Sequence, residues 1–222
     1  MARSLDSLSR QWSGVQPRAT ETAVRLRIAG LRGPRAGPFD LTADAGDCIA
    51  ISGASGSGKS MFLRMIADLD PNTGEVYLDG VSRAAMPAPA WRRRVVYNAA
   101  EPGWWHDDVA SHFAPDALAF ARDVGPRLGL SPGLLDAAVT RLSTGEKQRL
   151  ALIRALALTP PVLLLDEPTG ALDPDTTLLV ENVLRDRLAA GTTILFVSHS
   201  EDQARRLGNR RLRMENGGLV PA

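Results

Sequence analysis

The chain has 222 residues, 44% of them hydrophobic, which is enough to bury one sizeable core and predicts one domain with at most a small subdomain. Its formal net charge of +1 predicts no special affinity for nucleic acid or for anionic lipid. A single cysteine, Cys48, excludes an intrachain disulfide framework and fits a reducing compartment.

The sequence offers neither a membrane span nor an export signal. Its apolar runs all fall short of the roughly 20 residues needed to cross a bilayer, and residues 1–20 lack the apolar stretch of a signal peptide. We therefore expect a cytoplasmic protein that reaches a membrane only through a partner.

The N-terminal half alternates short strands with one helix. Residues 1–22 are polar and predict a flexible tail ahead of a folded domain at 23–222. Short β-rich runs follow, at 24–28, 48–52, 76–78 and 95–97. A Gly/Pro-rich stretch at 30–38 predicts a loop, and a helical pattern from Lys59 to about Leu69 ends before a turn at 71–74.

The C-terminal half predicts helices and then strands buried in a sheet. Residues 102–142 are Ala/Leu-rich with scattered Pro and Gly, which predicts several short helices, and a longer helix follows at 144–158. The apolar runs 162–165 and 193–197, separated by a helix at 176–190, are typical of strands buried on both faces of a parallel sheet. Strands alternating with helices predict an α/β fold with a mostly parallel core sheet.

Residues 53–60 (GASGSGKS) match the phosphate-loop pattern G-x-x-x-x-G-K-[ST] between a predicted strand and a predicted helix. Glycines let such a loop curl so that its backbone N–H groups point at phosphate oxygens, and the helix N-terminus adds positive charge. Lys59 is predicted to reach the β- and γ-phosphates, and Ser60 to ligate Mg²⁺. The remaining predicted phosphate contacts are Gly53, Ser55, Gly56, Ser57 and Gly58.

An acidic pair, Asp166 and Glu167, follows the apolar run 162–165. Ligands of open α/β sheets sit at the carboxyl ends of the strands, so both acids belong near the phosphates. We predict that Asp166 holds Mg²⁺ and that Glu167 orients the attacking water. An acidic pair after an apolar run is also typical of a helix cap or a turn.

Residues 142–149 (LSTGEKQR) resemble the LSGGQ signature of ATP-binding cassette (ABC) ATPases. Thr144 and Glu146 depart from the signature, whereas Ser143 and Gly145 keep it. The rest of the family's order follows: Gly170-Ala171-Leu172-Asp173 is similar to its D-loop, and His199 after the next strand is similar to its switch histidine.

The resemblance implies a P-loop NTPase core with a mostly parallel sheet, a small antiparallel β region on its N-terminal side, and a short helical subdomain at about 102–158. It implies hydrolysis of ATP with Mg²⁺, catalysed by Glu167 and His199. It also implies that Ser143, Gly145, Glu146 and Asp173 complete the ATP site of a second copy in a homodimer. The partner is then a separate transmembrane permease, the location is peripheral on the cytoplasmic face of the membrane, and no nucleic acid is expected. The short helical segment is similar to that of compact iron-export-type cassettes.

Two positions depart from the family. Ala100 stands where the family has a glutamine that helps to position Mg²⁺, so Glu101 or water must complete the magnesium shell. The family often stacks adenine on an aromatic residue near the first strand, but residues 29–38 contain none, and we expect contact from Leu31 or Arg32 instead.

Trp104 and Trp105 follow the missing glutamine and allow two interpretations. Exposed tryptophans suit a groove for a membrane partner, because Trp is enriched at interface hot spots. Both side chains packing into the helical subdomain is the alternative.

Two other functions stay open. One is a soluble cassette acting on nucleic acid or the ribosome, although the duplicated cassette or long coiled-coil insertion of such proteins is not present in this sequence. The other is a nucleotide-binding regulator with little hydrolysis, which the alanine at position 100, in place of the family's glutamine, leaves open.

Overall fold

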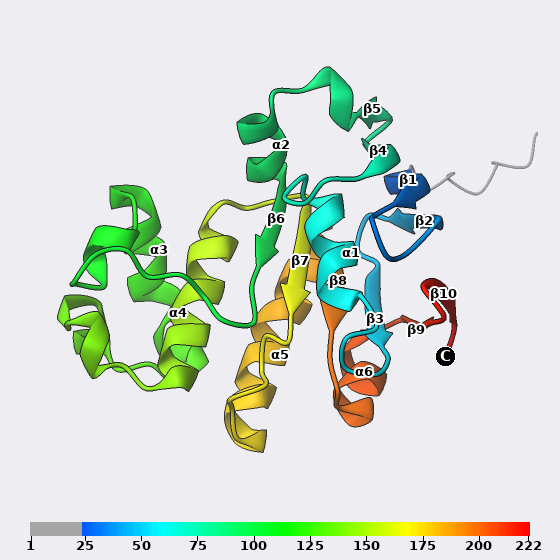
Figure 1. The fold of residues 1–222 in the computed structure, drawn as a ribbon. Helices are drawn as coiled ribbons and strands as arrows, with labels where there is room; N and C mark the ends of the chain where they lie inside the picture. The colour runs from blue at the N-terminus through cyan, green and yellow to red at the C-terminus, as the bar shows by residue number, and fades with distance from the viewer. Residues whose placement is uncertain (1–23) are drawn as a thin grey trace, which may run out of the picture.

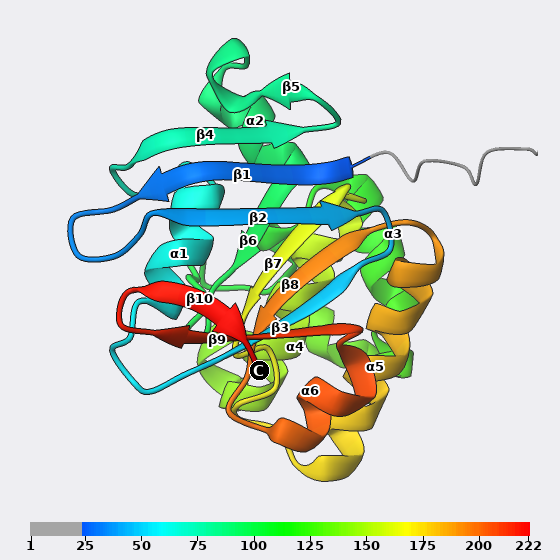
Figure 2. The same cartoon turned by 90° about the vertical axis from the view of Figure 1, so that its right-hand side faces the viewer.

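A computed structural model describes residues 24–222 (Figure 1), so the tail predicted at 1–22 lies outside the described residues. A small antiparallel sheet has the order β2-β1-β4-β5. Its strands are β1 (Val24–Arg32), β2 (Phe39–Asp44), β4 (Thr73–Leu78) and β5 (Val81–Ser82). Figure 2 shows its three longer strands lying side by side, with α1 close to them.

The core sheet has the order β10-β9-β3-β8-β7-β6, and every neighbouring pair in it is parallel except β10 with β9. Its strands are β3 (Cys48–Ser52), β6 (Val95–Asn98), β7 (Val162–Asp166), β8 (Thr193–Val197), β9 (Arg210–Glu215) and β10 (Gly218–Pro221). The parallel strands end at one edge of the sheet, which lies at the bottom in Figure 1.

Helices cover the core sheet. They are α1 (Lys59–Ile66), α2 (Ala88–Arg94), α3 (Pro115–Val124), α4 (Thr144–Ala157), α5 (Pro174–Ala189) and α6 (Glu201–Leu207). Short 3₁₀ turns lie at Arg83–Ala85, Ala110–His112, Pro126–Leu128, Pro132–Asp136 and Val139–Arg141.

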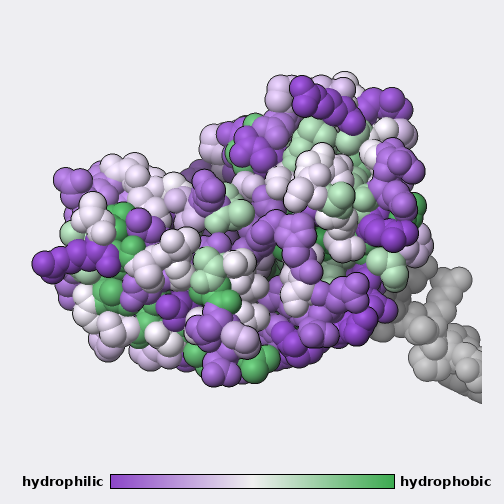
Figure 3. Space-filling model, turned by 60° about the horizontal axis from the view of Figure 1, so that its bottom comes forward, coloured by the Kyte–Doolittle hydropathy of each residue, from purple (hydrophilic) through white to green (hydrophobic). Residues whose placement is uncertain are grey.

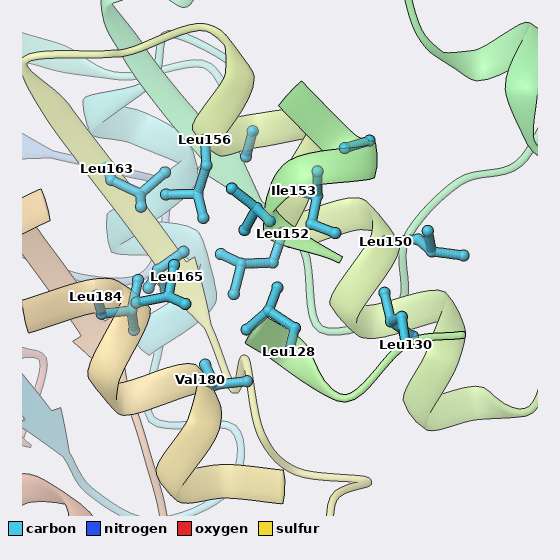
Figure 4. Close-up of a cluster of buried hydrophobic side chains, with 14 of the residues drawn as sticks. Leu128, Leu130, Leu150, Leu152, Ile153, Leu156, Leu163, Leu165, Val180 and Leu184 are labelled. Atoms are coloured by element: carbon cyan, nitrogen blue, oxygen red, sulfur yellow. The ribbon is translucent and has the colours of Figure 1, made fainter. Parts of the chain in front are cut away.

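Alternate residues of the core strands serve two different apolar cores, because successive side chains of a strand point to opposite faces. On β7, Leu163 and Leu165 pack with α3, α4 and α5, as Figure 4 shows for Leu152, Leu156 and Leu184. Val162 and Leu164 pack on the other face with α1 and the antiparallel sheet. The core sheet is therefore the middle layer, and both apolar cores are built on it.

The predicted fold class is confirmed: a mostly parallel P-loop core, an antiparallel region on the N-terminal side, and short helices before the long α4. The extent of a helical subdomain at about 102–158 stays a prediction. Cys48 begins the strand predicted at 48–52 and is buried, and burial raises the pKa of its thiol to about 12. Within residues 24–222, no helix combines the length and apolar character that a bilayer crossing requires.

Some boundaries were wrong. Residues 30–32, predicted as loop, belong to β1, because Leu31 pairs with Phe39 of β2 and Arg32 with Thr73 of β4, and Leu31 is fully buried. The first helix ends at Ile66 rather than Leu69, and a strand begins inside the predicted turn at Thr73. Sequence patterns did not predict five elements: β2, α2, α6, β9 and β10. The sequence of β9 (RRLRME) is more basic than that of a typical sheet strand.

The double-sided burial of β7 predicts a large cost for truncation there. Leu164→Ala removes a fully buried side chain and should lower the free energy of unfolding by about 2–5 kcal/mol. Leu178→Ala is the matched control, because Leu178 on α5 is 42% exposed and its loss should cost less than about 1 kcal/mol. Urea denaturation measures both, and equal losses would contradict the placement of β7 between two cores.

Candidate nucleotide site

The phosphate loop joins β3 to α1, as its sequence predicts. Gly53, Gly56 and Gly58 all have positive φ, at 141°, 75° and 102°. A Cβ at Gly53 would lie 2.7 Å from the Met214 carbonyl oxygen, so a side chain there would clash as well as strain the backbone. Glycine is therefore required at this position by β9 as much as by a ligand.

Lys59 is folded into the loop, where its Nζ donates hydrogen bonds to the carbonyl oxygens of Gly53 (2.8 Å) and Ala54 (2.9 Å). The lysine is only 6% exposed although it carries a charge. The Ser57 hydroxyl is buried and makes no hydrogen bond within the described chain. A buried cation and an orphaned hydroxyl facing one loop fit a polyanion such as a nucleotide phosphate chain.

Asp166, at the end of β7, is 4% exposed, and its Oδ2 accepts a hydrogen bond from the Tyr97 hydroxyl at 2.9 Å. Burial, with Asp166 nearby, raises the pKa of Tyr97, so this hydroxyl stays a donor. The hydroxyl of Ser60 and the carboxylate of Asp166 are hard oxygen donors of the kind that suits Mg²⁺. The donor set therefore fits the predicted metal.

Glu167 and His199 are brought together although they lie far apart in the chain. His199 Nε2 lies 2.9 Å from Glu167 Oε1. Glu167 has a φ of 47°, a left-handed conformation that is costly for a residue with a Cβ, and its N–H donates to the Val197 carbonyl. The pairing of β7 with β8 thus holds both side chains at the same strand edge.

Glu167 and His199 line two adjoining cavities. One, of about 340 Å³, is also lined by Ser55, Gly56, Ser57, Gly58, Lys59 and Ser60 of the phosphate loop. The other, of about 580 Å³, is also lined by Thr169, Gly170, Leu172 and Pro174 and by residues of α6. Figure 3 shows the face at the strand ends, where hydrophilic surface predominates and apolar patches are small. The carboxylate–imidazole pair therefore faces open, polar space beside the phosphate loop.

The signature residues lie elsewhere. Ser143 caps α4 in a capping box: its Oγ accepts from Glu146 N–H (3.3 Å), and Glu146 Oε2 accepts from Ser143 N–H (2.8 Å) and from Ser143 Oγ (2.8 Å). These hydrogen bonds lower the pKa of Glu146. Gly145 packs against the loop after Glu167, where an added Cβ would meet Leu172 Cδ2 at 2.9 Å.

Asp173 caps α5, with Oδ1 accepting from the Thr176 N–H at 2.8 Å. Neither cavity is lined by Asp173 or by any of residues 142–149. One described chain thus brings together the phosphate loop, Glu167 and His199, and leaves Ser143, Gly145, Glu146 and Asp173 outside the cavities.

The expected adenine contacts need correction. Leu31 is buried in the core and is unavailable to a ligand. The loop between β1 and β2 instead places Arg35 and Ala36 in the wall of the 340 Å³ cavity. Arg35 was not predicted at the site, although its place in a Gly/Pro-rich loop after the first strand was a usable signal.

At the position of the missing glutamine, Ala100 contributes its carbonyl oxygen, which accepts from Gln148 Nε2 at 3.2 Å. Glu101, the expected substitute, is exposed and lines neither cavity.

The two tryptophans differ in exposure. Trp104 packs partly buried against the core, as the packing interpretation expects, whereas Trp105 is 63% exposed, as the interface interpretation expects. The Arg154 guanidinium lies over both rings, at 5.1 Å and 4.7 Å from their centroids.

A glycine-rich phosphate loop, a buried aspartate and a glutamate–histidine pair at the carboxyl ends of parallel strands define a P-loop nucleotide-binding site. Comparison with known proteins narrows this class. The family model described as ABC transporter matches residues 37–170, more than half of the chain. The chain belongs to the ABC transporter family, as an ATP-binding subunit with ATPase activity.

Individual relatives support the same family assignment. The chain is 37% identical over 198 residues to the lipoprotein-releasing system ATP-binding protein LolD of Nitratidesulfovibrio vulgaris, covering 82% of this chain and 84% of that protein. It is 34% identical over 207 residues to the arginine transport ATP-binding protein ArtP of Escherichia coli, covering 82% and 84%. Other relatives are longer, and the chain spans 51% to 63% of their length.

A solved structure described as an ATP-binding subunit of an ABC transporter superposes with a TM-score of 0.80 at 22% identity, covering 89% of this chain and 90% of that one. This likeness supports the fold. The narrower resemblance to iron-export-type cassettes stays a prediction.

Proposed function

We propose that the chain hydrolyses ATP in a composite site shared with a second copy and uses the cycle to drive a separately encoded membrane permease. The observation that carries the proposal is the incompleteness of the site in one chain. Lys59, Glu167 and His199 line the cavities, whereas Ser143 and Gly145, the residues that resemble the family signature, line neither. The names of LolD and ArtP, which belong to a releasing system and a transport system, support a part in transport.

The residues of the phosphate loop bind and orient the triphosphate. On binding, Lys59 Nζ exchanges its two carbonyl partners for β- and γ-phosphate oxygens, and the orphaned Ser57 hydroxyl gains an acceptor. Ser60 and Asp166 hold Mg²⁺, with the Tyr97 hydroxyl fixing the carboxylate. When bound, Mg²⁺ neutralises charge on the β- and γ-phosphate oxygens.

Glu167 orients the attacking water. The water oxygen forms a bond to the γ-phosphorus, and the bond from that phosphorus to the β,γ-bridging oxygen breaks with its electron pair going to ADP. The proton lost by the water passes to the phosphate product or to solvent. His199, 2.9 Å from Glu167 Oε1, fixes the direction of the carboxylate.

The second copy supplies Ser143 and the N-terminus of α4 to the γ-phosphate. Ser143 is exposed at the start of α4, so its hydroxyl and the neighbouring N–H groups can face a ligand across an interface. Gly145 packs on the loop that follows Glu167, which places the signature of each copy beside its own loop 167–173. Closure around two ATP molecules and reopening after hydrolysis supply the movement.

Arg35 holds the nucleoside in place of an aromatic residue. It lies in the wall of the cavity that the phosphate loop lines, and a planar guanidinium stacks on rings. Because such stacking reads no base edge, we expect weak selectivity among purine nucleotides.

The permease docks at a groove of about 280 Å³ between β6 and α4, lined by Tyr97, Pro102, Gly103, Ala151, Arg154 and Leu158 among others. Trp105 beside it is exposed, and Leu158 is exposed at its end. Arg154 is desolvated there, which lowers its pKa, and its buried Nη1 makes no hydrogen bond within the described chain. An apolar segment with a polar acceptor fits this groove, and docking places the protein on the cytoplasmic face of the membrane.

Glu167→Gln tests the catalytic assignment. The amide keeps the shape of the carboxylate but replaces one acceptor oxygen with an NH₂ donor, so it orients the attacking water poorly. We expect kcat to fall by about 100-fold or more while ATP still binds. Phosphate release measures kcat, and a fluorescent ATP analogue measures binding. Wild-type turnover near zero with Glu167 intact would instead favour a nucleotide-binding regulator.

Ser143→Arg tests the composite site. The bulky cation blocks the interface, so hydrolysis should be lost while the Kd of the monomer for ATP changes less than about twofold. Glu167→Gln slows hydrolysis and so should keep an ATP-bound dimer closed. Gel filtration with ATP should therefore show a dimer for Glu167→Gln and none for the variant that combines Glu167→Gln with Ser143→Arg. Hydrolysis that persists in Ser143→Arg would exclude shared sites.

Trp105→Ala tests the docking groove. We expect co-purification with the permease from a membrane fraction to fall by about tenfold or more, as for an interface hot spot, with the ATPase rate of the isolated chain unchanged. Trp91→Phe, which alters a buried tryptophan outside the groove, is the control. Equal permease recovery with Trp105→Ala and with wild type would contradict docking at this groove.

A further inference from the structure

Gln148 is a buried amide that the proposed hydrolytic mechanism does not use. It lies on α4, three residues after Gly145, and is 7% exposed. Its Nε2 donates to the Ala100 carbonyl at 3.2 Å, and its Oε1 accepts from the Ala171 N–H at 3.3 Å. The carbonyl and the N–H each match only one end of an amide, so the orientation of the side chain follows from its partners.

These two partners belong to segments with different tasks. Ala100 begins the stretch 100–105 that leads past the docking groove to Trp105. Ala171 lies four residues after Glu167, in the loop 167–173 that ends at Asp173. Because Ala100 has no polar side chain, its contact with Gln148 runs through the main chain.

A second buried glutamine holds the same loop at another residue. Gln203, on α6, is 1% exposed and hydrogen-bonded to Thr169, with Nε2 to Oγ1 at 3.0 Å and Oγ1 to Oε1 at 3.1 Å. The helix α6 begins directly after His199 and Ser200. Loop 167–173 is therefore fastened at Thr169 to the helix that follows His199, and at Ala171 to the signature helix.

The burial of Gln148 makes its two hydrogen bonds interdependent. A buried polar group left without a partner is unfavourable, so displacement of Ala100 favours a movement of the amide that keeps both contacts. Such a movement pulls or releases Ala171 and, through the short turn in which the Gly170 N–H donates to the Glu167 carbonyl, the backbone of Glu167. The positive φ of Glu167 makes its carboxylate sensitive to that backbone.

We propose that Gln148 is a positioning residue that couples the segment 100–105 to the loop of Glu167, in place of the glutamine side chain that Ala100 lacks. The proposal deepens the proposed function, because it rests on permease docking beside 100–105. Gln148 acts through the Ala171 N–H and touches neither substrate nor metal.

The test uses the full chain with Gln148→Met, which removes both hydrogen bonds at similar volume, and Gln148→Glu, which keeps an acceptor for Ala171 and loses the donor to Ala100. Gln203→Met is the control, because it loosens the same loop without touching Ala100. Steady-state ATPase assays give kcat and KM, and hydrogen exchange with mass spectrometry follows peptides over 99–105 and 167–173 with and without Mg-ATP. Thermal unfolding checks that each variant is folded.

In the wild type we expect Mg-ATP to slow exchange in both segments. In Gln148→Met the response at 99–105 should be lost while that at 167–173 remains, and kcat should fall about tenfold with KM within about twofold. Gln148→Glu should keep slow exchange at Ala171 and still lose the response at 99–105. Gln203→Met should lower kcat and keep that response.

A purely structural role predicts a different pattern, in which all three variants lose stability and the response at 99–105 persists. Persistence of that response in a folded Gln148→Met, or an unchanged kcat, overturns the proposal. If Gln148→Met does not fold, the exchange pattern of Gln148→Glu decides alone. A wild type that binds ATP but shows no response at 99–105 also overturns the coupling and leaves the ATPase assignment standing, whereas a wild type without hydrolysis overturns the proposed function.

Discussion

The parallel pairing of β3, β8 and β7 is the constraint on which the site depends. Each strand is buried on both faces, so its register is held by two apolar cores at once. That register brings Gly53, Asp166, Glu167 and His199, from three distant parts of the chain, to one edge of the sheet. Glu167 and His199 then lie 2.9 Å apart, although they are distant in the sequence.

The residues at this edge were predictable because short local sequence patterns identify them. The phosphate loop, the acidic pair and His199 each follow an apolar run, and the end of a buried parallel strand is where such residues meet. Lys59 inside the loop and His199 beside Glu167 agree with that reasoning. The two-sided burial of residues 162–165 was equally predictable, since a short uninterrupted apolar run between turn residues is typical of a strand covered on both faces.

What escaped prediction depends on long-range contacts that no local pattern encodes. β9 is a sheet strand despite its arginines because it pairs with β3. Its Arg211, Arg213 and Glu215 side chains are exposed, whereas Met214 is buried. The sequence suggested that Leu31 contacts a nucleotide, but the pairing of β1 with β2 and β4 buries it. Arg35 lines the cavity instead. Tyr97 and Gln148 gain their roles from partners 69 and 23 or more residues away, so only the folded chain identifies them.

Different kinds of interaction hold the sheet edge and the segments around it. The strand edges that carry Asp166 and the phosphate loop rest on close apolar packing, which resists small displacements. The segments that we propose meet a second copy or a permease are held by polar contacts instead. These contacts are the cap of Ser143 with Glu146, the amide of Gln148, and the pair of Thr169 with Gln203. A hydrogen bond contributes only about 1 kcal/mol net to stability, so these segments are held less firmly than the apolar sheet edge. In the proposed cycle, the sheet edge stays fixed while ATP binding at the phosphate loop moves the hydrogen-bonded segments around it.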